Sequence, residues 1–159
     1  MKLLRRFGFL LATLCVTLPA WTFAQETPVG LWKTIDDTSG KPRALVRITE
    51  INGTLQGRIE KLFLDPDEPQ NSKCVACTDA RKDQPIVGLT IVSGLRKETD
   101  APVWSGGEIL DPKNGKIYKS KATLIDGGKK LDVRGYIGIA LIGRTQTWVR
   151  EQERMVESH

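Results

Sequence analysis

Short alternating runs rich in Val, Ile and Thr follow one another along this sequence, and each run ends at a turn signal. Apolar and polar residues alternating with period two are typical of β-strands that bury one face. No apolar pattern of helical period extends beyond a turn or two, so we predict an all-β fold. The eight predicted strands are Val29–Ile35, Ala44–Ile51, Thr54–Phe63, Val87–Leu95, Val103–Leu110, Lys116–Ile125, Lys130–Tyr136 and Ile142–Arg150.

The residues between these runs predict tight hairpins. Asn52-Gly53 separates two runs by two residues, and both residue types tolerate the positive φ that a type I′ turn requires. Asn114-Gly115, after Asp111-Pro112, is predicted to form the same two-residue turn, and Asp126-Gly127-Gly128 joins the next pair of runs. Strands joined by tight hairpins are neighbours in the sheet, so we expect an up-and-down antiparallel order.

An antiparallel sheet of eight strands leaves two unpaired edges unless it closes on itself. We therefore predict an eight-stranded up-and-down barrel, whose interior is either filled by side chains or holds one small ligand. Glycines inside the runs fit strongly curved strands; they are Gly57, Gly94, Gly106, Gly107 and Gly135. An open two-sheet sandwich is the alternative architecture.

The first residues are typical of an export signal. Lys2, Arg5 and Arg6 precede an apolar run over Phe7–Leu18, which is too short to span a bilayer stably. Thr22-Phe23-Ala24 supplies small residues for a signal peptidase, so we predict cleavage after Ala24; an uncleaved membrane anchor is the alternative. The predicted organisation is a signal peptide over residues 1–24, one barrel domain over 25–150 and a charged tail over 151–159. The mature protein is expected in the periplasm or secreted.

Charge and composition exclude several function classes. The net charge of +5 falls to about +2 once the leader is removed, and no basic stripe with interleaved aromatics remains, so nucleic-acid binding is not indicated. The single histidine is His159, at the chain end, so a catalytic Ser-His or Cys-His pair and a His-ligated metal centre have no source of imidazole. No nucleotide-binding glycine motif occurs. We predict no cofactor and no metal, and nothing in the sequence supports an enzyme.

A long polar connection, Leu64–Pro85, interrupts the succession of hairpins and contains Cys74-Val75-Ala76-Cys77. Connections of this length are usually functional or held by a cross-link. Cys74 and Cys77 are the only cysteines of the predicted mature chain, so in an oxidising compartment we expect a disulfide between them. A redox-active C-x-x-C site and half of a metal site are the alternatives.

Several segments together resemble a family of exported bacterial proteins, DUF2147. They are Gly30-Leu31-Trp32, the Cys74-x-x-Cys77 loop followed by Pro85-Ile-Val-Gly88-Leu, the stretch from Trp104 to Tyr118, and the stretch from Arg134 to Arg150. The resemblance covers roughly Val29 to Arg150. It implies a lipocalin-like (calycin) β-barrel in the cell envelope, and it supplies no catalytic residues.

Gly30-x-Trp32 also resembles the first-strand signature of lipocalins. In that family the Trp packs across the closed end of the barrel, beneath a basic residue of the last strand. The resemblance implies that Arg150 or Arg144 stacks on Trp32 through a cation–π contact. The alternative is a Trp32 that only fills the core, and in both cases Trp32 is structural.

The function that these observations favour is binding of a small apolar or amphipathic molecule in the barrel mouth. The predicted lining residues are Trp104, Tyr118 and Tyr136, with Arg134 and Arg144 as anchors for an anion. The same aromatics in a solid core would leave no such site. Two further hypotheses are an interaction module that docks through loop 64–85 on another envelope protein, and a thiol–disulfide redox protein acting through Cys74 and Cys77.

Overall fold

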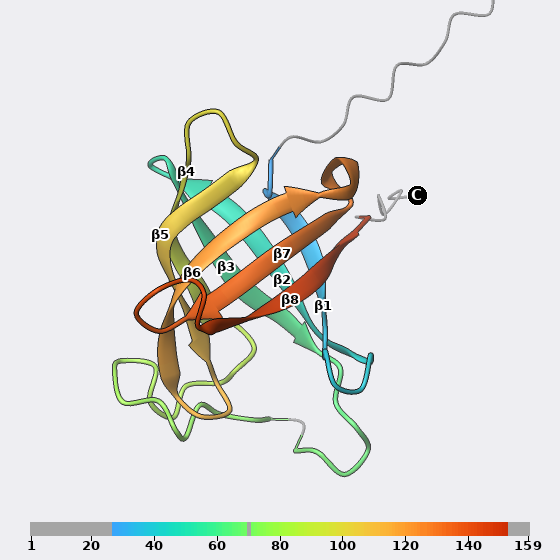
Figure 1. The fold of residues 1–159 in the computed structure, drawn as a ribbon. Helices are drawn as coiled ribbons and strands as arrows, with labels where there is room; N and C mark the ends of the chain where they lie inside the picture. Colours follow the sequence, from blue (N-terminus) through green and yellow to red (C-terminus); the bar gives the residue numbers. More distant parts are fainter. Residues whose placement is uncertain (1–26, 70, 153–159) are drawn as a thin grey trace, which may run out of the picture.

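The structure is a computed structural model that describes residues 27–69 and 71–152. Eight antiparallel strands follow one another around a closed barrel (Figure 1). They are β1 (Gly30–Ile35), β2 (Pro42–Ile51), β3 (Thr54–Leu62), β4 (Thr90–Lys97), β5 (Val103–Asp111), β6 (Lys116–Ile125), β7 (Lys130–Tyr136) and β8 (Gly143–Glu151). The predicted all-β, up-and-down barrel is confirmed. The predicted signal peptide lies outside the described residues.

Pairing between β1 and β8 closes the barrel and rules out the open sandwich. Trp32 of β1 lies opposite Arg150 of β8, with Leu31 opposite Glu151 on one side. Strand β8 therefore includes Glu151, which the sequence had placed in the tail. Among residues 27–69 and 71–152, no helix is long and apolar enough to cross a membrane.

Two of the three predicted turns have the expected form. Asn52 and Gly53 both adopt positive φ between the paired residues Ile51 and Thr54, as a type I′ hairpin requires. Asp126 to Gly128 forms a single 3₁₀ turn between β6 and β7.

The prediction for Asn114-Gly115 is wrong in its length. Asp111 pairs with Lys116, so the loop between β5 and β6 has four residues rather than two. The Asp111 carboxylate accepts a hydrogen bond from the Lys113 backbone N–H at 2.9 Å, and Gly115 N–H bonds back to Asp111 O at 2.8 Å. This local side-chain turn, together with Pro112, ends the ladder earlier than a two-residue hairpin would.

Strand β4 begins later than predicted, at Thr90 instead of Val87. Gly88 has a φ of +99°, and Leu89 N–H bonds to Ile86 O at 3.1 Å. This turn keeps Val87 and Gly88 in the long connection between β3 and β4. The other predicted strand bounds lie within two residues of the observed ones.

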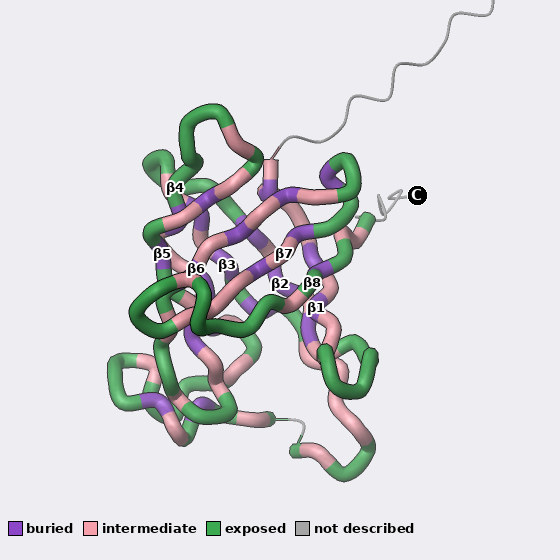
Figure 2. The backbone as a smooth tube through the Cα atoms, in the orientation of Figure 1, coloured by how far each residue is buried: buried purple, intermediate pink, exposed green. Residues whose placement is uncertain are grey.

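The two ends of the barrel differ in packing. At the end where the β2–β3 and β6–β7 turns lie, large side chains fill the interior, and buried positions recur along the strands (Figure 2). The principal side chains of this closed end are Trp32, Leu55, Leu95, Trp104, Leu124 and Leu131. At the opposite end, the open end, the long connections gather and leave the interior hollow. The barrel is thus solid in one half and hollow in the other.

Candidate functional site

A cavity of about 720 Å³ occupies the open end of the barrel. Its mouth is surrounded by the connections that leave the open ends of the strands, with the long β3–β4 connection at the bottom of Figure 1. The volume lies within the range of about 300–1,000 Å³ that is usual for sites that hold one small molecule.

The deep part of the cavity is apolar. Inward-facing residues from six of the strands line it: Ala44, Val46, Ile59, Ile91, Ile109, Val133 and Trp148. Below Tyr118 on the inner face of β6 lies Ser120, whose fully buried hydroxyl has no hydrogen-bond partner among the described residues. Apart from this hydroxyl, the apolar side chains of the inner walls offer an apolar ligand chain a surface on which it buries no polar group of its own.

The rim of the cavity is charged, and its charges are balanced. Its acidic side chains are Asp36, Glu68 and Asp111, and its basic ones are Arg43, Lys113 and Arg144. Arg43 Nη2 lies 3.1 Å from Glu68 Oε1, and Arg144 forms an ion pair with Asp37. These pairs tie the β1–β2 and β3–β4 connections to the strands beside the mouth.

Hydrogen bonds at the rim favour the ionised carboxylates. The backbone N–H of Asp65 donates to Glu68, and with the Arg43 guanidinium it holds the pKa of Glu68 below its ordinary value. The pKa of Asp36 is also lowered, because the backbone N–H and the hydroxyl of Ser39 and the Thr38 N–H all donate to its carboxylate. Both acids therefore remain charged at neutral pH.

The long connection beside the mouth is cross-linked by the disulfide Cys74–Cys77, as predicted. Both cysteines are buried, with 0% and 2% of their surfaces exposed. Cys74 N–H bonds to Gln84 O at 2.9 Å and Asp83 N–H to Cys74 O at 3.1 Å, so the main chain closes the same loop.

This disulfide loop packs against the β5–β6 connection. A Cβ placed on Gly115 would lie 1.9 Å from Ala76 O, and Cys74 Sγ lies 3.6 Å from Pro112 O. The chain between residues 71 and 85 contains no helix. Redox-active C-x-x-C sites expose one sulfur at a helix N-terminus, so the arrangement is that of a structural cross-link.

At the closed end, Arg150 covers Trp32 with its guanidinium carbon 4.2 Å from the ring centroid. The same guanidinium donates to the carbonyls of Thr27, Val29 and Gly128 at 2.6–2.9 Å. Trp32 Nε1 donates to Pro28 O at 2.7 Å. Desolvation at this position lowers the pKa of Arg150 from its ordinary value.

The structure brings together three of the five predicted ligand-contacting residues. Tyr118, Tyr136 and Arg144 line the cavity. Arg134 lies outside it, because it occupies an outward position of β7 and donates to the carbonyls of Ala140 and Leu141 in the β7–β8 connection.

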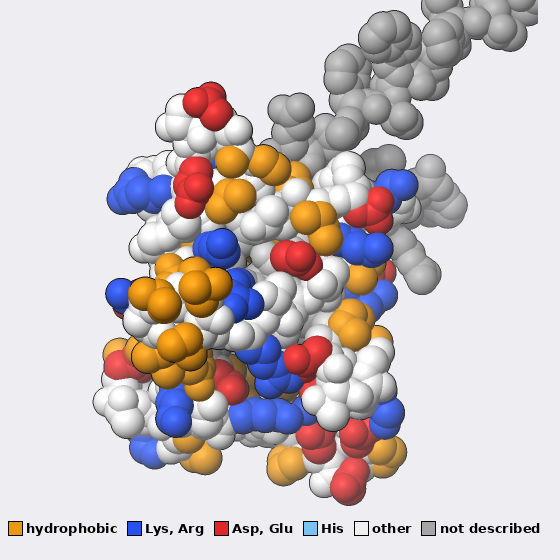
Figure 3. All heavy atoms as spheres, viewed as in Figure 1, with side chains coloured by type: hydrophobic (Ala, Val, Ile, Leu, Met, Phe, Trp, Pro, Cys, Tyr) orange, Lys and Arg blue, Asp and Glu red, His pale blue; other side chains and the backbone are white. Residues whose placement is uncertain are grey.

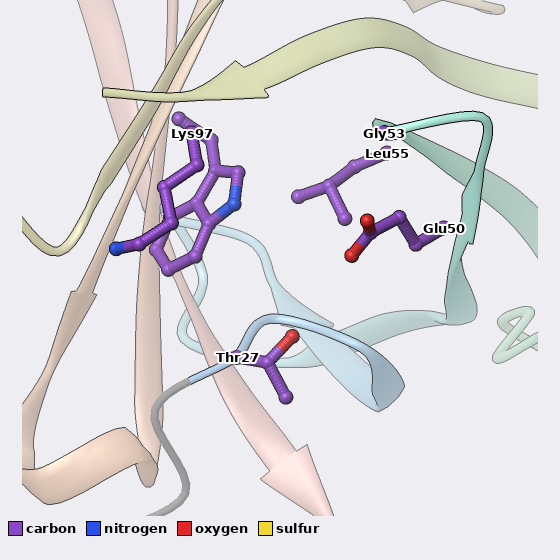
Figure 4. A pocket seen from close by; sticks show the side chains of 6 residues that line it. Thr27, Glu50, Gly53, Leu55 and Lys97 are labelled. Carbon is purple, nitrogen blue, oxygen red and sulfur yellow. The ribbon is translucent and has the colours of Figure 1, made fainter. Parts of the chain in front are cut away.

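Trp104 lies at the other end of the barrel. It pairs with Ala122, whereas Tyr118 pairs with Ile109, because the starts of two antiparallel neighbours lie at opposite ends of the sheet. Trp104 lines a separate pocket of about 210 Å³ with Thr27, Glu50, Gly53, Leu55 and Lys97 (Figure 4). Lys97 Nζ lies 4.6 Å from its ring centroid.

Several residues of the cavity were not predicted from the sequence. Arg43 and Glu68 lie 25 positions apart and meet only because the β3–β4 connection folds back over the mouth. No role was predicted for Trp148, although alternation along β8 places its side chain on the same face as that of Arg144. Within residues 27–69 and 71–152, no group of three or more acidic, Cys or His side chains is arranged to hold a metal ion.

The chain is similar to known proteins in sequence and in fold. The model of the bacterial family described as "Uncharacterized protein conserved in bacteria (DUF2147)" matches residues 30–150. No curated protein matches the chain. Among solved structures, Helicobacter pylori protein HP1028, described as belonging to the lipocalin family, is similar with a TM-score of 0.66. The sequences are 20% identical, and the alignment covers 79% of this chain and 83% of that one, so the likeness shows a lipocalin-like fold.

Proposed function

The chain belongs to the bacterial family DUF2147, and we propose that it is an exported, non-catalytic binding protein for one small amphipathic molecule. The observation that carries the proposal is the cavity of about 720 Å³, with apolar walls inside the barrel and charged groups only at its mouth. Such a distribution suits a molecule that places its apolar part inside and its polar end in water. The lipocalin-like fold is compatible with this role.

The balance of charge at the rim narrows the class of ligand. Three acidic and three basic side chains line the mouth, and Arg43 and Arg144 already pair with carboxylates. A polar end that both donates and accepts hydrogen bonds, or that is zwitterionic, therefore suits the rim better than a strongly anionic one. Tyr118 and Tyr136 also line the cavity, and the Tyr118 hydroxyl accepts a hydrogen bond from Asn114 Nδ2 at 3.3 Å.

Binding of the uncharged fluorescent probe N-phenyl-1-naphthylamine tests the proposal. We expect the probe to bind wild type with increased fluorescence, and an added phenyl group in the cavity to reduce its affinity at least tenfold. Ala44→Phe is the cavity variant, because Ala44 faces the hollow interior. Ile117→Phe is the matched control, because Ile117 is 44% exposed and lies outside the cavity. Equal probe affinity in both variants would contradict binding inside the barrel.

Export rests on the sequence signal, and we propose that the mature protein begins at Gln25 in the periplasm or outside the cell. N-terminal sequencing of protein from the periplasmic fraction tests this. A first residue of Gln25 supports export with cleavage, whereas an intact Met1 in the cytoplasm contradicts it.

One observation favours the alternative of a protein-interaction module. Val75, between the two cysteines, is 65% exposed, and Val87 at the end of the same connection is 47% exposed. An apolar residue held outward on a cross-linked loop is suited to contact a partner protein. If Val75→Ser leaves probe binding intact but abolishes a stable complex recovered from envelope extracts, this loop is the functional surface.

A further inference from the structure

The connection between β7 and β8 exposes an unusual amount of apolar surface. Ile137, Ile139, Leu141 and Ile142 are 65%, 61%, 86% and 68% exposed, and only Gly138 and Ala140 separate them. Figure 3 shows hydrophobic side chains gathered over this connection. Single exposed apolar residues are ordinary, but a continuous group of this size marks a contact with a protein or a membrane.

The loop holds this surface outward in a fixed shape. Arg134 Nε donates to Ala140 O at 2.6 Å, Nη2 to Leu141 O at 3.1 Å and Nη1 to Thr145 Oγ1 at 2.9 Å. Ile142 N–H bonds to Ile139 O at 3.1 Å and Ile137 N–H to Ile142 O at 3.3 Å. Because these contacts satisfy the loop's backbone, the apolar side chains remain turned toward solvent instead of folding back onto the barrel.

Basic residues lie beside the loop on the outer wall. Lys119 of β6 pairs with Tyr136 at the end of β7, and Lys121 pairs with Arg134. Both lysines alternate with the inward-facing Tyr118 and Ser120, so they point away from the cavity. Figure 3 shows Lys and Arg side chains next to the hydrophobic group.

From this arrangement we propose that residues 137–142 dock the protein on an anionic phospholipid bilayer. The apolar side chains enter the boundary between headgroups and acyl chains, and Lys119 and Lys121 face the lipid phosphates. A group of four adjacent residues on one short loop is small for a stable protein interface, which buries about 800 Å² on each partner, but it is sufficient for shallow insertion into a fluid interface.

The position of the loop gives the contact a direction. Ile137 and Ile142 belong both to the exposed group and to the lining of the cavity. Docking through this loop therefore brings the mouth of the barrel to the lipid surface. The proposal goes beyond ligand binding, and membrane contact is measured separately from occupancy of the cavity.

Flotation with vesicles of phosphatidylglycerol and phosphatidylethanolamine tests the docking. We expect the wild-type protein to float with these vesicles. The partition coefficient of the variant Ile139→Gln/Leu141→Gln should be at least tenfold lower. Neither of these residues lines the cavity, so the variant should still bind N-phenyl-1-naphthylamine. The matched control is Ile51→Gln/Val149→Gln, because these residues are 48% and 38% exposed outside the loop; it should float as wild type does.

The basic residues are tested with the variant Lys119→Gln/Lys121→Gln. Wild type should prefer these anionic vesicles to vesicles of phosphatidylcholine, and the variant should lose that preference; added salt should have the same effect. The proposal is overturned if the wild-type protein does not float, or if it floats no better than the loop variant. A wild-type dimer that the loop variant converts to a monomer in sedimentation would show that the surface binds a second copy instead.

Discussion

Arg150 lies over the indole of Trp32 and, at the same time, binds three backbone carbonyls from two separate segments of the chain. One of these segments precedes β1, and the other is the β6–β7 turn. The cation–π contact and the three hydrogen bonds therefore join the first strand, the last strand and a turn across the seam where the barrel closes. This group closes one end of the barrel, and the cavity lies at the opposite end.

Replacing Arg150 tests the importance of that seal. We expect Arg150→Ala to lower the free energy of unfolding by about 3 kcal/mol, because the carbonyls lose charged donors and Trp32 loses its cover. Arg150→Lys should recover only part of this, because an ammonium group cannot reach three carbonyls with the planar guanidinium geometry. Urea unfolding followed by Trp fluorescence measures both. Arg96→Ala, at an exposed position of β4, is the control and should change stability by less than about 0.5 kcal/mol.

Gly30 is predicted to tolerate no side chain. Its φ is +137°, and a Cβ there would lie 2.8 Å from Arg150 Nη1. We expect Gly30→Ala to destabilise the protein by about 2 kcal/mol through backbone strain and displacement of the guanidinium. In a double-mutant cycle with Arg150→Ala the two effects should be less than additive, because the second change removes the clash. Simple additivity would show that Gly30 and Arg150 act independently.

The Cys74–Cys77 disulfide is expected to stabilise its loop and not the barrel. It closes a ring of four residues, so the variant Cys74→Ser/Cys77→Ser should lower the free energy of unfolding by about 2 kcal/mol at most. The main-chain hydrogen bonds of the loop should remain in this variant. Because both sulfurs are buried, dithiothreitol should reduce the native protein more slowly than the urea-unfolded protein. Equal rates would mean that the disulfide is accessible and would favour the redox hypothesis.

The ion pair between Arg43 and Glu68 predicts a pH dependence. Glu68 has a pKa below its ordinary value of 4.5, so the folded state holds its proton less tightly than the unfolded state does. Its contribution to stability is therefore present above about pH 4.5 and is lost as the pH falls through the lowered pKa. Unfolding curves of wild type and Glu68→Gln should differ by a constant amount near neutral pH and converge in acid. A difference that does not shrink as the pH falls below 4.5 would contradict this.

Local signals in the sequence were sufficient to predict the barrel. Alternation predicted the strands, and Asn52-Gly53 predicted a hairpin in which both turn residues adopt positive φ, as the structure shows. The prediction of a two-residue turn at Asn114-Gly115 was wrong. The Asp111 carboxylate accepts a hydrogen bond from Lys113 N–H, and this side-chain turn makes the β5–β6 loop longer than Asn114-Gly115 alone indicates.

The candidate site was less predictable because it depends on register and on contacts between distant segments. Tyr118 and Trp104 lie on neighbouring strands, yet Trp104 lies opposite Ala122 and not opposite Tyr118, so the antiparallel register places them toward opposite ends of the barrel. Counting residues from the turn would have revealed this. The pairing of Arg43 with Glu68 has no local signal, since it depends on the path of the long connection.

Native mass spectrometry of the mature protein, purified gently without detergent, tests the central claim most directly. We expect wild type to carry a non-covalent amphipathic adduct that is released on collisional activation, and Ala44→Phe, which narrows the cavity, to carry much less. The control Ile117→Phe should retain the adduct. A wild-type protein that is bare, and that remains bare after incubation with a lipid extract of its own envelope, would contradict the account of the barrel as a binding protein.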